Sequence, residues 1–247
     1  MQTAVVIPVY NEARTIRRVV EGALKQTSRV IVVDDGSVDD SHRQLEEMDV
    51  TLLRNPHNMG KGFSLQRGLQ HALSLGAQLV ITLDGDTQHN PAEIPGLLQA
   101  AAAHPDRIII AARLRQRQNA PRLRLFANRF ADFWVSWAAG YPVVDSQSGF
   151  RLYPRKALEA THIQISPQQG FVFESEFLIE AARHRIYSIS VPVESIYRAG
   201  GRGSHYRPWR DTWRIVRMIA GRLIRRGLYL RGLLQAIQLM SDPRNIN

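Results

Sequence analysis

The feature of this sequence that most limits its possible folds is a repeated alternation between short apolar runs and amphipathic segments. Compact runs rich in Val, Ile and Leu, typical of buried strands, occupy residues 4–8, 29–33, 51–53, 79–83 and 107–112. Segments with one apolar helical face lie between several of them, most clearly at residues 16–24 and 60–75. This alternation predicts βαβ units and an α/β fold, a mostly parallel sheet flanked by helices.

The pattern changes near residue 113. Residues 121–139 predict a helix, residues 186–193 predict one further strand, and residues 208–234 predict a long amphipathic helix or a pair of helices. The chain contains no internal repeat and no low-complexity tract. A length of 247 residues allows one domain with a sizeable core, so no disulfide or metal is required for stability.

We therefore expect one main domain over residues 1–207, followed by a basic amphipathic helical tail over residues 208–247. The change near residue 113 divides the domain into two halves, residues 1–112 and 113–207. The acidic motifs described below lie in the first half, and the two halves are expected to bind different substrates.

Cysteine is absent, which excludes disulfides, thiolate nucleophiles and Cys-ligated zinc or iron–sulfur clusters. Residues 1–10 predict a strand without a basic segment or a long apolar segment, so a signal peptide is not expected. No apolar run approaches the ~18 residues that a membrane span requires. The expectation is a soluble or peripheral protein compatible with the cytoplasm.

The net charge of +10 is unevenly distributed. Residues 113–131 contain six arginines and no acidic residue, and residues 198–231 contain ten arginines with Asp211 alone. The rest of the chain is net acidic. Arginine grips phosphate with a planar fork of donors, so nucleic acid, anionic lipid and phosphorylated small molecules are all candidate partners on composition alone.

Two acidic clusters follow predicted strands. Asp34 and Asp35 follow the second strand, and Asp84 and Asp86 follow the fourth. Ligands of parallel sheets bind outside the carboxyl ends of the strands, so both clusters should reach one edge. Asp84, Asp86 and Gln88 offer oxygen atoms that suit Mg²⁺ or Mn²⁺, an ion able to neutralise a leaving diphosphate. The alternatives are an ordinary turn at Asp84 and a helix N-cap at Asp34.

Four motifs resemble those of the family 2 glycosyltransferases, which have the GT-A (Rossmann-like) fold. They are Ile7-Pro8-Val9-Tyr10-Asn11-Glu12, Val33-Asp34-Asp35-Gly36-Ser37, Asn58-Met59-Gly60-Lys61-Gly62 and Leu83-Asp84-Gly85-Asp86. The order and spacing of all four match across residues 4–95. The resemblance implies a UDP- or GDP-linked sugar donor, a divalent cation and inversion at the anomeric carbon.

The resemblance also implies roles for single residues. Pro8, Tyr10 and Glu12 would line the nucleoside pocket, and Asp35, or else Asp34, would accept a hydrogen bond from the base. Lys61 would lie near the nucleotide. Asp84 and Asp86 would flank the metal and the ribose.

Motifs of the second half resemble the polyprenyl-phosphate sugar transferases, which include dolichyl-phosphate mannose synthase. They are Asp145-Ser146-Gln147-Ser148-Gly149-Phe150-Arg151 and Phe173-Glu174-Ser175-Glu176-Phe177, together with Gln88 and His89 after the acidic pair. This resemblance implies that Gln88 joins the metal ligands and that Arg113 with a later arginine holds the acceptor phosphate. The loop with Arg202, Ser204 and His205 would close on the donor diphosphate, although His205 stands where a lysine is usual.

The candidate catalytic residues are Asp86, Glu176 and Asp145. A phosphate acceptor is already an anion at neutral pH, whereas a hydroxyl acceptor needs a general base, for which Glu176 and Asp145 are the candidates. The alternative for these two acids is a structural salt bridge to Arg151 or Arg183.

The basic tail has two interpretations. One helical arc carries Trp209, Trp213, Val216, Ala220, Leu223, Ile224 and Leu234, and the opposite side carries Arg210, Arg214, Arg217, Arg222 and Arg225. The helix can pack on the domain with a solvated basic face, or it can lie on an anionic membrane surface. The aromatic side of residues 121–139 can likewise form ordinary core or border a groove for a lipid chain. Nucleic acid is not expected, because no nucleic-acid-binding motif is present.

The sequence predicts a metal-dependent, inverting glycosyltransferase that moves a sugar from a nucleotide-diphosphate donor to a polyprenyl phosphate or a similar membrane lipid. It is expected in the cytoplasm, peripheral on the inner face of the membrane. One alternative is a family 2 enzyme that acts on a hydroxyl in cell-envelope glycan or glycolipid synthesis. Another is a nucleotide-sugar-binding protein without turnover, and a basic nucleic-acid-binding protein is a weaker third.

Overall fold

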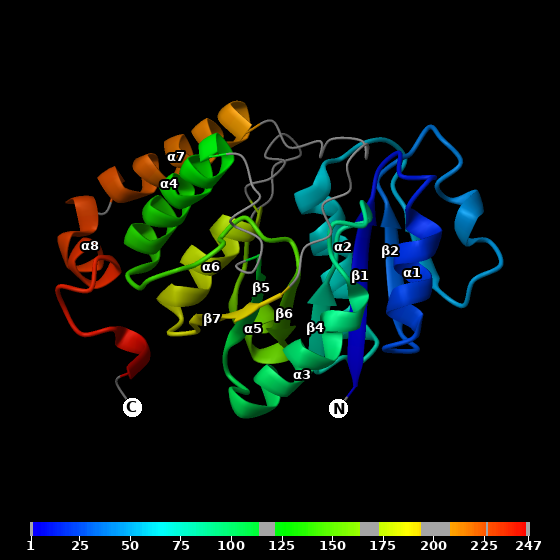
Figure 1. Cartoon of the computed structure of the whole chain (residues 1–247), viewed down its shortest axis with the longest axis horizontal. Coiled ribbons are helices and arrows are strands. Elements are labelled where there is room, and N and C mark those ends of the chain that lie inside the picture. Colours follow the sequence, from blue (N-terminus) through cyan, green and yellow to red (C-terminus); the bar gives the residue numbers. More distant parts are fainter. Residues whose placement is uncertain (1, 114–121, 164–172, 194–207, 226, 246–247) are drawn as a thin grey trace.

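The computed structural model describes residues 2–113, 122–163, 173–193, 208–225 and 227–245. These residues form a seven-stranded sheet with the strand order β3-β2-β1-β4-β6-β5-β7. The strands are β1 (Thr3–Val9), β2 (Val30–Asp34), β3 (Thr51–Arg54), β4 (Leu79–Thr82), β5 (Ile108–Ala112), β6 (Arg151–Pro154) and β7 (Ser188–Pro192). In Figure 1, β1 runs upward from the N-terminus.

The predicted α/β fold with a mostly parallel sheet is confirmed. Strands β1, β2, β3 and β4 pair in parallel, as do β5 and β7, and all the strands predicted from apolar runs are present. Strand β6 is antiparallel to both β4 and β5 and is absent from the sequence prediction. Its four residues, Arg151–Pro154, contain no continuous apolar run, and its first residue is a buried arginine.

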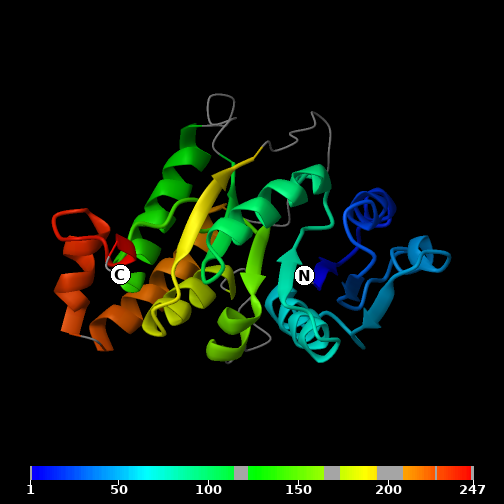
Figure 2. The ribbon, with the colours of Figure 1, turned by 90° about the horizontal axis from the view of Figure 1, so that it is seen from below.

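Helices cover both faces of the sheet, as the view from below shows (Figure 2). They are α1 (Ile16–Leu24), α2 (Lys61–Ser74), α3 (Ile94–Ala103), α4 (Arg122–Ala139), α5 (Arg155–Ala160), α6 (Phe173–Arg183), α7 (Pro208–Arg225) and α8 (Leu230–Ala236). Successive side chains of β1 enter two different cores, as the strand period of two requires. Val5 and Ile7 pack with α1 and α3, whereas Ala4 and Val6 pack with α2 and the C-terminal helices.

Helices α4, α7 and α8 form a layer at one end of the molecule (Figure 1). Helix α4 packs against α6, and α7 and α8 pack against α4. The predicted helix pair in residues 208–234 is confirmed, because Gly227, Leu228 and Tyr229 adopt positive φ values between α7 and α8. The predicted domain boundary at residue 207 lies outside the described residues.

The predicted apolar arc of the tail is confirmed in part. Val216 and Leu223 of the arc are buried, together with Ile219, and α7 packs against α4, but Trp213 and Ile224 are 67% and 68% exposed. The buried line of α7 thus overlaps the predicted arc but leaves these two residues outside it. Among the described helices, none combines the length and the apolar character that crossing a bilayer would require.

The side chains of α4 also divide into a buried set and an exposed set. Its small residues Ala127, Ala131 and Val135 are buried, whereas Phe126 is 63% exposed and Phe130 and Phe133 are each 39% exposed. The expectation of ordinary core is therefore wrong for these phenylalanines. Small side chains let α4 approach its neighbours closely, and the larger rings are left on the outer side.

Candidate active site

The carboxyl ends of β1, β2 and β4 bring both acidic clusters to one edge of the sheet. Asp34 is the last residue of β2 and lies in register with Val9 of β1. The backbone N–H of Asp35 donates to the Val9 carbonyl over 2.8 Å, and that of Leu83, next to Asp84, donates to the Val6 carbonyl. The predicted convergence at one edge is confirmed.

An ion triad lies at the centre of this edge, with Glu174 buried and Lys61 and Asp84 half-buried. Lys61, the first residue of α2, places its Nζ 2.7 Å from Oδ1 of Asp84 and 2.8 Å from Oε1 of Glu174. Glu174 belongs to the first turn of α6, so the triad joins α2, the end of β4 and α6. Gly149 backs it closely, because a Cβ there would lie 2.6 Å from Asp84 Oδ2 and 2.9 Å from Lys61 Nζ.

The ion pairs favour the charged forms of Lys61 and Asp84. Burial alone would lower the pKa of Lys61, but the charges of Asp84 and Glu174 outweigh burial and raise this pKa well above its usual value. Burial would raise the pKa of Asp84, and the Lys61 charge outweighs it, so that pKa is lowered. The site therefore presents a fixed ammonium beside a carboxylate at neutral pH.

Asp86 differs from Asp84 in having no ion-pair partner within the described part of the chain. Its Oδ1 accepts a hydrogen bond from the backbone N–H of Gln88 over 3.0 Å, across Thr87 at a φ of +64°. Burial, and then the negative charge of Asp84, raise the pKa of Asp86. A cation bound nearby would stabilise the ionised form of Asp86.

His89 completes this turn on its buried side. Its Nδ1 lies 3.7 Å from Oδ2 of Asp84, and its ring packs on Phe150 with centroids 5.4 Å apart. Burial lowers the pKa of His89, which keeps the imidazole neutral beside the triad. His89 therefore packs the turn rather than adding a charge to it.

The candidate metal ligands fit a site completed by a substrate. Among the described residues, no three His, Asp or Glu side chains are arranged to hold a metal ion by themselves. Asp84, Asp86 and Gln88 would supply two carboxylates and one amide, hard oxygen donors of the kind that Mg²⁺ and Mn²⁺ prefer. Such a set leaves coordination positions for phosphate oxygens.

The carboxylate of Asp35 is enclosed by the segment that leads into α2. Its Oδ1 accepts hydrogen bonds from Asn55 Nδ2 over 2.7 Å and from the Met59 N–H over 2.9 Å. Its Oδ2 accepts from the N–H of Gly60 over 2.8 Å. Gly60 has a φ of +94°, and Lys61 follows it directly. Asp35 therefore positions the start of α2 and with it the triad.

The loop after β1 is tied to the loop after β2. The N–H of Asn11 donates to Ser37 Oγ over 3.0 Å, and the N–H of Glu12 donates to Ser41 Oγ over 2.8 Å. Asp34 contributes on the other side, since its Oδ1 accepts from the Ser37 N–H and its Oδ2 lies 3.2 Å from Arg54 Nε. These bonds hold the half-buried Tyr10 and Glu12 at the edge between the acidic clusters.

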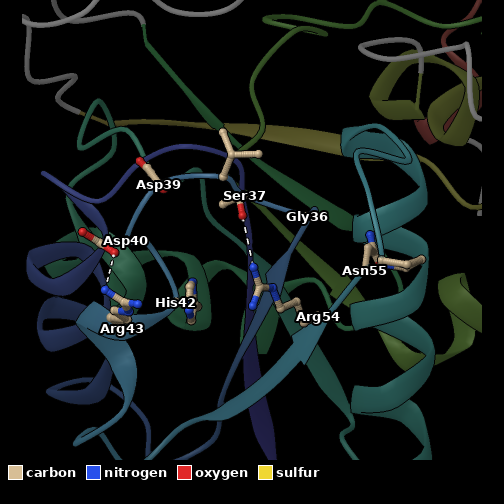
Figure 3. A pocket seen from close by; sticks show the side chains of 10 residues that line it. Gly36, Ser37, Asp39, Asp40, His42, Arg43, Arg54 and Asn55 are labelled. Atoms are coloured by element: carbon tan, nitrogen blue, oxygen red, sulfur yellow. Dashed lines mark hydrogen bonds and ion pairs between the residues drawn. The ribbon is translucent and has the colours of Figure 1, made fainter.

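A cavity of about 830 Å³ opens beside these loops (Figure 3). The segment after β2 and the end of β3 line it: Gly36, Ser37, Val38, Asp39, Asp40, His42, Arg43, Arg54, Asn55 and Pro56. Figure 3 shows Arg54 directed at Ser37, whose carbonyl accepts from Nη2 over 3.2 Å. Of the predicted nucleotide-binding residues, Asp34 and Asp35 lie next to this cavity, and Lys61 and Asp84 lie in the triad.

Arg113 and Asp145 form a second ion pair at the end of β5. The backbone N–H and Nε of Arg113 donate to Asp145 Oδ2, and Nη2 donates to Oδ1 over 2.6 Å. Asp132 of α4 holds this loop, since its two oxygens accept from the N–H groups of Asp145 and Ser146. Asp145 thus forms the structural salt bridge considered above, with Arg113 rather than Arg151 or Arg183.

Arg151 is unavailable for an ion pair because backbone carbonyls occupy its guanidinium. This fully buried side chain donates to Ser146 O and Glu174 O, each over 2.7 Å, and to Ser148 O over 2.9 Å. Arg151 therefore ties the loop after Asp145 to the start of α6.

The two acids of α6 face different neighbours. Glu176 pairs with Arg222 of α7, so both residues proposed from the sequence as its partner are wrong. Burial raises the pKa of Glu176. Glu174, absent from the sequence prediction, is the acid that reaches Lys61. Glu174 and Glu176 are two positions apart, so their side chains point about 200° away from each other around the helix. Only a prediction of how the helix Phe173–Arg183 is turned toward the sheet could have shown which of the two acids reaches Lys61.

The remaining predicted phosphate-binding residues, Arg202, Ser204 and His205, lie outside the described residues. Their role therefore stays a prediction from the resemblance.

The model of the family described as Glycosyl transferase family 2 matches residues 4–161. A UDP-N-acetylglucosamine–dolichyl-phosphate N-acetylglucosaminyltransferase from Methanococcus voltae is 28% identical over 78% of this chain and 84% of its own length. A polyprenol monophosphomannose synthase from Mycolicibacterium smegmatis is 26% identical over 78% of this chain and 76% of its own.

The fold is also found in a solved structure of glucosyl-3-phosphoglycerate synthase from Mycobacterium tuberculosis, crystallised with Mn²⁺, UDP-glucose and phosphoglyceric acid. The two structures superpose with a TM-score of 0.64 at 19% identity, covering 91% of this chain and 79% of the other. At this identity the likeness establishes the fold alone.

Asp132 should make stability depend on pH. Burial raises its pKa from 3.8 to about 6, so the folded protein holds a proton between these values that the unfolded chain has lost. The stability contributed by protonated Asp132 is therefore complete below pH ~4 and is lost as the pH rises through ~6. Relative to Asp132→Asn, which cannot titrate, the wild type should lose up to about 3 kcal/mol of unfolding free energy over that range.

Urea unfolding of both proteins from about pH 4 to pH 7 measures this difference, because every other group titrates in both. The exposed Asp49→Asn controls for the loss of one negative charge. A difference between wild type and Asp132→Asn that stays constant across the range would contradict the prediction.

Proposed function

Because this glycosyltransferase belongs to glycosyl transferase family 2, we propose that it moves a sugar, with inversion, from a nucleotide-diphosphate donor to a polyprenyl phosphate. The observation that carries the proposal is the acceptor in the names of the two relatives, a dolichyl phosphate and a polyprenol phosphate. Each relative aligns with 78% of this chain. The fold brings acidic and cationic groups suited to a diphosphate to the carboxyl edge of the sheet.

On the donor side, Asp84, Asp86 and Gln88 would hold Mg²⁺ or Mn²⁺, which would neutralise charge on the departing diphosphate. The ammonium of Lys61 donates to a phosphate oxygen, and Glu174 keeps that ammonium in place. Pro8, Tyr10, Glu12, Asp34 and Asp35 receive the nucleoside, with the cavity beside Ser37 and Arg54 next to them. The donor is a UDP- or GDP-linked sugar.

On the acceptor side, the ion pairs favour a phosphate over a hydroxyl. Glu176 and Asp145, the two candidate bases, form ion pairs with Arg222 and Arg113, so a hydroxyl acceptor would have to compete with an arginine for either carboxylate. A phosphate oxygen needs no base: it attacks the anomeric carbon while the bond from that carbon to the diphosphate breaks. The bonding electrons leave with the diphosphate. We propose that Arg113 holds the acceptor phosphate and that Arg202, Ser204 and His205 hold the donor diphosphate.

The exposed side chains of α4 and α7 suit a lipid surface. Phe126, Phe130 and Phe133 project from α4, and Trp213 and Ile224 project from the adjacent α7. Exposed arginines on the same helices, Arg129 and Arg217, add positive charge. Rings and cations together are typical of helices at an anionic membrane interface. We propose peripheral binding there, and the inner face of the membrane stays a prediction.

Nucleotide titrations test the donor site. Titration calorimetry with UDP and with GDP, each with and without MnCl₂, should show tighter binding of one nucleotide when Mn²⁺ is present. Asp86→Asn should lose the Mn²⁺-dependent gain. Glu174→Gln should weaken nucleotide binding by about tenfold, about 1.4 kcal/mol, with or without Mn²⁺, because Lys61 loses one of its two anchors.

The matched control is Glu159→Gln, which removes the same group from an exposed i,i+4 pair with Arg155. Its nucleotide affinity should equal that of the wild type. A full Mn²⁺-dependent gain in Asp86→Asn would refute the metal assignment.

Product analysis tests the acceptor. The purified protein with Mn²⁺ and a panel of UDP- and GDP-linked sugars is offered a short polyprenyl phosphate or the matched polyprenol, and lipids are analysed by mass spectrometry. One sugar should be added to the phosphate and none to the polyprenol. Transfer to the polyprenol that is lost in Glu176→Gln would instead establish a hydroxyl acceptor, and binding without turnover of any donor would leave a nucleotide-sugar-binding protein.

Vesicle sedimentation tests the membrane surface. Phe126→Ser combined with Phe130→Ser should reduce binding to vesicles of phosphatidylglycerol and phosphatidylcholine several-fold, because two rings no longer insert. Val38→Ser is the control, since Val38 is 87% exposed at the other end of the sheet. Wild-type binding should also fall with added salt. Equal sedimentation of wild type and double variant would remove α4 from the membrane contact.

A further inference from the structure

A second concave site lies at the edge of the sheet opposite to the acidic clusters. Arg107 directly precedes β5, and Tyr187 directly precedes β7, at the amino ends of these parallel strands. Lys156 follows the antiparallel β6 and so reaches the same edge. The length of β5 alone, at ~3.3 Å a residue, places this edge about 15 Å or more from the carboxyl edge.

A cavity of about 700 Å³ opens between these segments and α8. The segment that ends α3, the turn after α6, Arg231 and Gln235 of α8, and Pro243 surround it. Sites for small molecules commonly have volumes of ~300–1,000 Å³, so the space is sufficient for a small organic ligand. None of the residues lining it takes part in the donor or acceptor binding proposed above.

The walls of this cavity are strongly cationic. Arg107, Lys156, Arg185 and Arg231 line it together with one carboxylate, that of Asp106. Asp106 is already paired with Lys156 over 2.9 Å. Arg107 also interacts with the carboxylate of Asp242, so Arg185 and Arg231 carry the excess positive charge that a bound anion would balance.

Two of the arginines are uncommitted and one is fixed. Within the described part of the chain, Arg185 and Arg231 have no ion-pair partner. Arg107 is held in place, because its Nη2 donates to the Arg244 carbonyl over 2.9 Å and its guanidinium lies 5.3 Å from the centre of the Tyr187 ring. The cavity therefore combines a fixed guanidinium, two that can turn to a ligand, and an aromatic wall.

We propose that this cavity binds a phosphate ester. Guanidinium forks match the oxygen atoms of phosphate, and the Tyr187 ring with Pro105 and Pro243 offers an apolar wall for the esterified organic group. The ester is either a soluble phosphorylated metabolite or the headgroup of an anionic lipid. Two large exposed side chains near the cavity, Leu230 of α8 and Leu239 after it, would suit contact with a lipid. The site is independent of the transferase function proposed above.

Titration calorimetry with two probes tests the proposal and separates the two sources. The probes are glycerol 3-phosphate and monomeric dihexanoyl-phosphatidylglycerol, used below its micelle concentration. Wild type should bind at least one of them, and Arg185→Gln combined with Arg231→Gln should bind it about tenfold more weakly, because two charge-assisted contacts are lost. Binding of both probes indicates a soluble ester, and binding of the lipid alone indicates a headgroup.

The control is Arg17→Gln combined with Arg18→Gln, which makes the same change in charge at two exposed positions of α1. It should bind the probe as the wild type does. The proposal is overturned if neither probe binds the wild type, if the Arg185/Arg231 variant keeps wild-type affinity, or if the control loses as much affinity as that variant.

Discussion

The ammonium of Lys61, held between Asp84 and Glu174, is the interaction on which the rest of the candidate site depends. Each partner comes from a different part of the fold: α2, the end of β4 and the first turn of α6. A buried ion pair costs desolvation, and the loss of one member leaves an uncompensated charge. The fold therefore has to position α2, the end of β4 and α6 accurately relative to one another. The neighbouring hydrogen bonds hold these elements in position.

Two arrangements of hydrogen bonds supply the precision. Asp35 accepts from Asn55, Met59 and Gly60, which sets the position from which α2 and Lys61 begin. Arg151 donates to three carbonyls and fixes the start of α6, and with it Glu174. Both side chains are buried and occupied by backbone groups. The candidate site thus rests on two buried charged residues whose hydrogen bonds place Lys61 and Glu174.

The fold was predictable from the sequence because its signals are local. Apolar runs and their spacing indicate β1 to β5 and β7, and the order of acidic motifs after β2 and β4 indicates the edge at which they meet. Strand β6 escaped prediction because Arg151 opens it and no apolar run marks it. Arg151 can be buried because it donates to backbone carbonyls of the preceding loop and of α6, and no local sequence pattern reveals these partners.

The sequence did not predict which residues form ion pairs with Asp145 and Glu176. Asp145 pairs with Arg113 across 32 positions, and Glu176 pairs with Arg222 across 46, so each pairing follows from packing rather than from spacing. The predicted arc of α7 was wrong at Trp213 and Ile224. A helical wheel shows which residues share one side of a helix, but not which of them a neighbouring element covers.

These pairings bear directly on the chemistry. A hydroxyl acceptor would require an acid that is free to take a proton, yet both candidate bases are bound to arginines. Releasing either would leave a buried or half-buried charge without its partner, at a cost of several kcal/mol for a well-enclosed pair. An acceptor that arrives as an anion avoids that cost. In the proposed function such an acceptor would share the Arg113 guanidinium with Asp145, so one charge would serve both the fold at β5 and the substrate.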